Sequence, residues 1–129
     1  MRILVADNRA RTRFALRTLL GQRPGLCIVG EATDAAGLLA QVEAACPDLV
    51  LLDWGLRDLV ADDLLPGLRT LCPGLRVIAL SGRAEDEATV LAAGADAFVC
   101  KADPADCLLA AIDDSSCREP GRWVGGYRE

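Results

Sequence analysis

Five short apolar runs, separated by segments about the length of one helix and its loops, constrain the fold of this chain more than any other feature. The runs occupy residues 3–6, 26–29, 49–52, 77–80 and, more weakly, 97–100. Each is rich in branched side chains and lacks polar alternation, which is typical of strands buried on both faces of a parallel sheet. The pattern therefore predicts an α/β protein built from repeated strand and helix units.

Helical spacing fills the segments between these runs. We predict helices over residues 10–22, 35–46, 59–71 and 85–93 and a last helix beginning at residues 103–104. Asp34 is the predicted N-cap of the second helix, and Gly94 is the predicted left-handed stop of the fourth. Right-handed crossovers place helices on both faces of such a sheet, so the expected architecture is an open, doubly wound parallel sheet.

Two of the predicted helices carry further expectations. In the first helix, Phe14, Leu19 and Leu20 share one apolar side, and arginines lie elsewhere. In the third helix, Pro66 interrupts the apolar pattern, and an interior proline costs about 3 kcal/mol. We therefore expect the third helix to be kinked at Pro66 or to begin late.

Polar side chains follow four of the predicted strands. Asp7 and Asn8 come after the first run, Asp53 after the third, Ser81 after the fourth and Lys101 after the fifth. The ligand site of an open parallel sheet lies beyond the carboxyl ends of its strands. We therefore expect these five residues to share one edge of the sheet.

The residue types at this edge restrict its chemistry. Two nearby carboxylates need a compensating cation, and oxygen ligands favour a hard ion such as Mg²⁺. A lysine ammonium and a serine hydroxyl suit the oxygens of a phosphoryl group, and a carboxylate can act as the nucleophile that forms an acyl phosphate. No glycine-rich phosphate loop follows the first strand.

Composition excludes several other functions. Histidine is absent, which rules out a Ser-His-Asp or Cys-His nucleophile, a histidine base and a histidine-containing zinc site within this chain. The net charge of −5 has the wrong sign for a domain that binds nucleic acid or an anionic membrane. The length of 129 residues and the hydrophobic content of 52% fit one ordinary domain.

The cysteines and the N-terminus indicate the cellular compartment in which the protein is expected. Six cysteines lie far apart and form no C-x-x-C pair, so we expect reduced, mostly buried thiols. The N-terminus passes directly into the first strand without a signal peptide, and no apolar stretch is long enough to span a membrane. We therefore expect a cytoplasmic protein.

In these features the sequence resembles the receiver domain of bacterial two-component response regulators, especially receivers that precede helix-turn-helix output domains. The matching segments are residues 3–8, 28–32, 47–53, 77–82 and 93–101. The resemblance implies a flavodoxin-like (βα)5 fold with strand order 2-1-3-4-5. It covers residues 1–113 as the receiver domain and leaves residues 114–129 as a short polar tail with no output domain.

The resemblance also implies roles for single residues. Asp53 is the implied phosphoacceptor, Ser81 the switch hydroxyl, Lys101 the ionic partner of the phosphoryl group and Phe98 the aromatic switch residue. Without the resemblance, Phe98 would be interpreted as a core aromatic residue, and Ser81 would fit a helix N-cap equally well.

A magnesium site is implied at the same place. Its ligands would be Asp7, Asp53, the backbone carbonyl of Gly55 and Asn8. Asn8 replaces the second acidic residue of the family pattern, so we expect weaker Mg²⁺ binding.

Other departures surround the site. Arg57 replaces the usual proline four residues after the acceptor. We expect Arg9, Arg57 and Arg83 to add positive charge around the pocket. Trp54 is expected at the pocket rim or packed in the loop after its strand, and Trp123 and Tyr127 belong either to an unstructured tail or to a docking segment.

The expected function is phosphoryl acceptance in a two-component phosphorelay. The donor would be a sensor histidine kinase or phosphotransfer protein, and the face made by the fourth helix, fifth strand and fifth helix would contact a second copy or a downstream protein. The chain would catalyse at most its own phosphorylation and dephosphorylation. The alternatives are a phosphorylation-independent binding or dimerisation module and a metal-dependent phosphatase, for which Gly55 leaves no second carboxylate.

Overall fold

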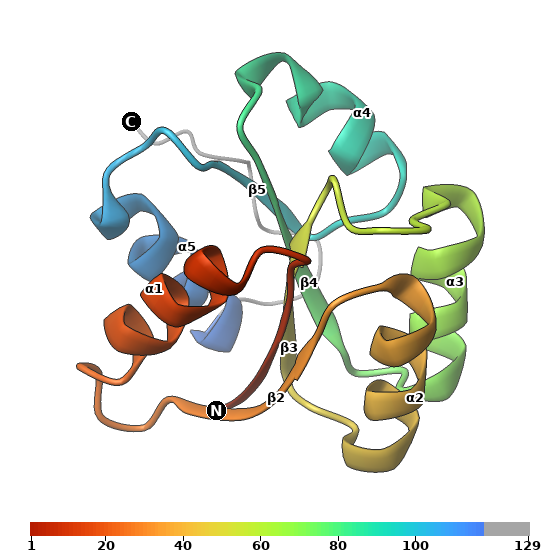
Figure 1. Ribbon diagram of the computed structural model, residues 1–129, viewed down its shortest axis with the longest axis horizontal. Helices are drawn as coiled ribbons and strands as arrows, with labels where there is room; N and C mark the ends of the chain where they lie inside the picture. The colour runs from red at the N-terminus through yellow and green to blue at the C-terminus, as the bar shows by residue number, and fades with distance from the viewer. Residues whose placement is uncertain (118–129) are drawn as a thin grey trace.

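The computed structural model of the chain describes residues 1–117 and, within the last helix, side chains as far as residue 114. Its five parallel strands run in the order β2-β1-β3-β4-β5, which confirms the expected fold and strand order (Figure 1). The strands are β1 Arg2–Ala6, β2 Cys27–Ala32, β3 Leu49–Asp53, β4 Arg76–Ser81 and β5 Ala97–Cys100. The helices are α1 Ala10–Leu20, α2 Ala35–Ala45, α3 Ala61–Leu71, α4 Glu87–Ala92 and α5 Ala105–Cys117, with a short 3₁₀ helix at Ala84–Asp86.

Helices cover both faces of the sheet (Figure 1). Helices α1 and α5 pack on one face, where Leu16 and Ile112 join a core built on Ile3 and its neighbours. Helices α2, α3 and α4 pack on the other face, where Leu38 and Leu68 are fully buried. Alternate residues of each central strand enter opposite cores, which explains why the apolar runs show no polar alternation.

The strand register aligns the carboxyl ends of the sheet. In the pairing of β3 with β4, Asp53 lies opposite Leu80, and in the pairing of β4 with β5, Ser81 lies opposite Cys100. Polar residues that end or follow these strands therefore emerge along one edge.

The second strand differs from its expected burial. Four of the six β2 residues are partly exposed and Cys27 is exposed. The reason is topological, because β2 pairs only with β1 and forms the edge of the sheet. A continuous apolar run alone does not distinguish an edge strand from a central one.

The first helix corrects the expected position of Phe14. Phe14 is 62% exposed, and Leu16 and Leu20 form the buried side instead. Phe14 lies two residues before Leu16, which places it about 200° away around the helix. The guanidinium of Arg17 lies over the exposed ring, 5.8 Å from its centre.

The structure confirms two predicted helix ends, the beginning of α2 and the end of α4. The Asp34 carboxylate accepts a hydrogen bond from the Gly37 N–H at 2.8 Å, as an N-cap of α2. Gly94 has a φ of +111° after α4, and the Ala95 N–H donates to the Val90 carbonyl at 3.3 Å. The predicted helix over 85–93 is divided, because the 3₁₀ turn occupies its beginning.

The third helix continues through its proline. It begins at Ala61, before Pro66, and runs to Leu71, so the late start does not occur. Pro66 has no N–H to donate to the carbonyl of Asp62. Burial of Leu64, Leu65 and Leu68 offsets this loss.

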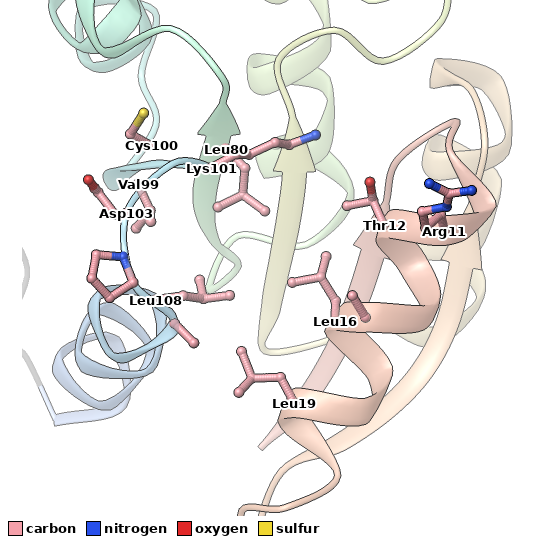
Figure 2. Close-up of a pocket in the computed structure, with 13 residues that line it drawn as sticks. Arg11, Thr12, Leu16, Leu19, Leu80, Val99, Cys100, Lys101, Asp103 and Leu108 are labelled. Carbon is pink, nitrogen blue, oxygen red and sulfur yellow. The ribbon is translucent and has the colours of Figure 1, made fainter.

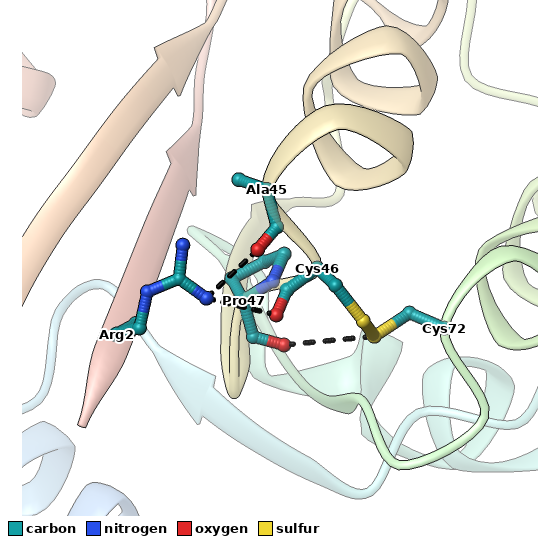
Figure 3. The surroundings of a disulfide bond; sticks show 5 residues. All are labelled: Arg2, Ala45, Cys46, Pro47 and Cys72. Atoms are coloured by element: carbon teal, nitrogen blue, oxygen red, sulfur yellow. Dashed lines mark hydrogen bonds between the residues drawn. A yellow bond between two sulfur atoms is a disulfide. The ribbon is translucent and has the colours of Figure 1, made fainter.

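A disulfide joins Cys46 to Cys72, with their Cα atoms 5.6 Å apart (Figure 3). This bond corrects the expectation of reduced thiols. Cys46 caps α2 and Cys72 caps α3, so two adjacent helices end side by side although the cysteines are 26 residues apart in sequence. The expectation of mostly buried thiols also fails for Cys27 and Cys107, which are free and exposed.

Arg2 closes the same end of α2. Its guanidinium donates to the carbonyls of Ala45 and Cys46, at 2.7 Å and 3.1 Å (Figure 3). A cation at this position offsets the negative end of the helix dipole.

Within residues 1–117, none of the helices combines the length and the apolar character needed to cross a membrane. Trp123 and Tyr127, for which a tail or docking role was expected, lie outside the described residues.

Candidate functional site

The carboxyl edge of the sheet brings together Asp7, Asp53 and Lys101. Asp53 is the last residue of the central strand β3, and Asp7 follows the neighbouring strand β1. Lys101 follows β5, and its Nζ lies 2.9 Å from Asp7 Oδ2 and 2.9 Å from Asp53 Oδ1. One ammonium group therefore bridges two carboxylates that are separated by dozens of residues in sequence.

Both carboxylates are removed from solvent. Asp7 is 1% exposed and Asp53 is 7% exposed, and they are two of only three buried polar residues within the described part of the chain. A buried carboxylate without a partner is costly, so the bridging lysine stabilises both. Asp7 Oδ1 also accepts a hydrogen bond from the Arg9 N–H at 2.8 Å.

Backbone hydrogen bonds hold the loops that carry these side chains. The Lys101 N–H donates to the Ser81 carbonyl at 2.7 Å, and the Trp54 N–H donates to the Leu80 carbonyl at 2.8 Å. The Asp7 N–H donates to the Ala32 carbonyl at 3.0 Å. The site is thus fixed by extensions of the sheet ladder rather than by free loops.

Ser81, the third buried polar residue, turns its hydroxyl toward the following loop. Its Oγ donates to Asp86 Oδ2 at 2.6 Å and accepts a hydrogen bond from the Arg83 N–H at 3.0 Å. The N-cap of the 3₁₀ helix is Arg83, so Ser81 does not itself cap a helix. Sequence reasoning missed Asp86, whose only signal is an acidic side chain in the first turn after β4.

The oxygen-rich edge fits a hard cation. The Oδ1 atom of Asn8 is buried and accepts no hydrogen bond within the described residues, although a buried amide oxygen normally has a partner. A Cβ placed on Gly55 would lie 3.6 Å from Asp53 Oδ2, so the Gly55 backbone lies beside the carboxylate. These groups are suitable Mg²⁺ ligands.

The acidic charge at this edge is limited. Across residues 1–117, no group of three or more His, Cys, Asp or Glu side chains is arranged to hold a metal ion. Asp7 and Asp53 are the two carboxylates, and Asn8 contributes only a neutral oxygen. Weaker Mg²⁺ binding stays a prediction that depends on this neutral oxygen.

The remaining predicted residues surround this centre. Phe98 is buried in the core shared with α2, α3 and α4, and Trp54 packs against the same core while partly exposed. Arg9 and Arg57 are exposed. Arg83 differs from its expected role, because its guanidinium pairs with Glu85 at 3.3 Å and Asp86 at 3.7 Å. Those carboxylates offset the charge that Arg83 would bring to the site.

A groove of about 460 Å³ opens beside Lys101, between α1 and the start of α5. Leu16 and Leu19 line it from α1 and Leu108 lines it from α5, while Arg11 and Thr12 line it at the beginning of α1 (Figure 2). The sequence did not indicate this groove, because it depends on how two helices distant in sequence pack.

Comparisons with known proteins agree with this architecture. Residues 3–113 match the response regulator receiver domain family. The transcriptional activator DevR/DosR of Mycobacterium tuberculosis is 36% identical over 103 residues, which cover 78% of this chain and 48% of that protein. The chain thus spans about half the length of the curated relatives it matches.

Solved receiver structures are similar in fold and length. The receiver domain of the regulator NarL from M. tuberculosis is 25% identical, with a TM-score of 0.79, and the match covers 91% of this chain and 97% of that one. A CheY-like receiver from Methanospirillum hungatei is 30% identical, with a TM-score of 0.75 and coverages of 88% and 90%. From its sequence match and its fold, the chain belongs to the receiver domain family of two-component response regulators.

Proposed function

We propose that this receiver domain accepts a phosphoryl group on Asp53 from a phosphohistidine of a sensor histidine kinase or phosphotransfer protein. The observation that carries the proposal is Lys101, whose ammonium lies 2.9 Å from Asp7 and 2.9 Å from Asp53. A lysine that touches the acceptor is already placed to pair with an anionic group transferred onto it.

The transfer is a displacement at phosphorus. A carboxylate oxygen of Asp53 forms a bond to phosphorus, and the bond from phosphorus to the donor histidine nitrogen breaks. The product is an acyl phosphate, and the electron pair leaves with the imidazole. The chain has no histidine, so the donor group must lie outside these 129 residues.

Mg²⁺ would be held by Asp7, Asp53, the Gly55 carbonyl and Asn8. When bound, it supplies positive charge beside the phosphoryl oxygens. Receiver domains of this family generally bind Mg²⁺. Lys101 and the Ser81 hydroxyl would pair with the remaining phosphoryl oxygens after transfer.

The output would be a change in a protein contact surface. Movement of Ser81 toward the phosphoryl group, with a change at Phe98, would shift the face made by α4, β5 and α5. Phe98 lies on β5 and is packed near α4, which supports this route. The partner would be a second copy or a downstream protein, because the net charge of −5 disfavours direct nucleic-acid binding by this chain.

Incubation with acetyl phosphate and Mg²⁺, followed by intact mass spectrometry, tests this function. Wild-type protein should gain the mass of one phosphoryl group, and Asp53→Asn should gain none, because the amide is not a nucleophile for this transfer. Beryllium fluoride with Mg²⁺ should change the fluorescence of Trp54, which directly follows the acceptor, measured in a Trp123→Phe background where Trp54 is the one tryptophan left. A wild-type protein that forms no adduct would instead favour a phosphorylation-independent binding module, and sustained hydrolysis of a foreign phosphoester would favour a phosphatase.

A further inference from the structure

The hydroxyl of Ser81 already forms two hydrogen bonds in the unphosphorylated protein. It donates to Asp86 Oδ2 at 2.6 Å, and it accepts from the Arg83 N–H at 3.0 Å. The serine is 6% exposed, so little water competes for these contacts. A hydrogen bond to a carboxylate is among the stronger ones that a hydroxyl forms.

Asp86 is itself held in place. It is the last residue of the 3₁₀ helix Ala84–Asp86, and its other oxygen lies 3.7 Å from Arg83 Nε. Its side chain is 25% exposed. Arg83 therefore contacts both members of the pair, with its N–H on the hydroxyl and its guanidinium on the carboxylate.

A serine hydroxyl has one proton to donate. While that proton is bound by Asp86, it is not available to an oxygen of a phosphoryl group on Asp53. We propose that Asp86 is a positioning residue that holds the Ser81 hydroxyl in the unphosphorylated protein and competes with the phosphoryl group for its proton. This inference rests on the proposed phosphorylation of Asp53. It adds that Asp86 sets how readily the Ser81 hydroxyl turns toward the phosphoryl group.

The expected effect is measurable with beryllium fluoride and Mg²⁺, titrated against the protein and followed by Trp54 fluorescence. Asp86→Ala removes the competing acceptor, so the apparent Kd for beryllium fluoride should fall about fivefold. Asp86→Asn keeps a weaker, neutral acceptor and should give a smaller decrease.

Two controls separate competition from simple loss of negative charge. Glu85→Gln removes a charge that pairs with Arg83 without contacting Ser81, and it should leave the Kd close to that of the wild type. In a Ser81→Ala background, Asp86→Ala should have no further effect, because the hydroxyl under competition is gone. An equal gain in both backgrounds would overturn the proposal.

A second readout does not depend on phosphorylation. NMR couplings between the Hα and Hβ protons of Ser81 report its χ1 rotamer, which should be single in the wild type and mixed in Asp86→Ala. An unchanged single rotamer would overturn the role of Asp86. Failure of the wild-type protein to bind beryllium fluoride would overturn the proposed function instead, and the rotamer measurement would still decide whether Asp86 holds the hydroxyl.

Discussion

At the scale of single residues, Lys101 is the side chain that links the two carboxylates of the site. It is the only lysine among 14 basic residues, and it bridges Asp7 and Asp53. An ammonium is a compact charge on a flexible stem, whereas a guanidinium is a planar fork that prefers one carboxylate at a time. This difference explains why arginine is not equivalent here although the chain uses it everywhere else.

Replacing Lys101 with arginine should reduce phosphorylation more than stability. We expect Lys101→Arg to lower the rate of phosphorylation by acetyl phosphate about tenfold, with a small change in Tm, because charge is kept and geometry is lost. Lys101→Met should also destabilise the fold by roughly 3 kcal/mol, since two buried carboxylates lose their partner. Intact mass and thermal unfolding measure both effects, and a Lys101→Arg protein with wild-type rates would refute this role.

Asn8 limits the charge of the magnesium site. Asn8→Asp adds a carboxylate, so we expect Mg²⁺ affinity to rise about tenfold. Without Mg²⁺ the added charge lies near Asp7 and Asp53, so the Tm should fall and then recover as Mg²⁺ is added. Titration by Trp54 fluorescence and thermal unfolding test this, with Arg57→Lys as a charge-conserving control. An unchanged Mg²⁺ affinity would exclude Asn8 from the ligand set.

At the scale of helices and strands, the sequence predicted features that depend on neighbouring residues better than features that depend on tertiary packing. The cap at Asp34 and the stop at Gly94 depend on neighbouring residues and were predicted correctly. The exposure of Phe14 and the continuation of α3 through Pro66 depend on which faces meet in the fold. Those outcomes are decided by tertiary contacts that a sequence pattern does not contain.

The disulfide between Cys46 and Cys72 should stabilise the fold from the ends of α2 and α3. Because it closes a loop with a sequence separation of 26, its loss should lower the free energy of unfolding by about 3 kcal/mol. Cys46→Ser and Cys72→Ser should each lower the urea midpoint, and reductant should do the same to the wild type. Cys27→Ser, at a free and exposed cysteine, is the matched control. A reductant-insensitive midpoint in the wild type would contradict this role.

At the scale of the whole molecule, parallel topology assembles the site. Lys101 and Asp7 are 94 residues apart, and the strand order brings them within 2.9 Å. The sequence predicted this meeting, because polar residues after parallel strands must share one edge. It did not predict the Ser81–Asp86 contact, the pairing of Arg83 or the groove beside Lys101, since each depends on loop conformation and helix packing.

The central claim is that Asp53 accepts the phosphoryl group, and locating the acyl phosphate tests it most directly. Protein treated with acetyl phosphate and Mg²⁺ is reduced with borohydride, which converts an aspartyl phosphate to homoserine, and is then digested and sequenced by mass spectrometry. We predict homoserine at position 53 and unmodified aspartate at position 7. Homoserine at another aspartate, or none in a protein that is otherwise folded, would contradict the account.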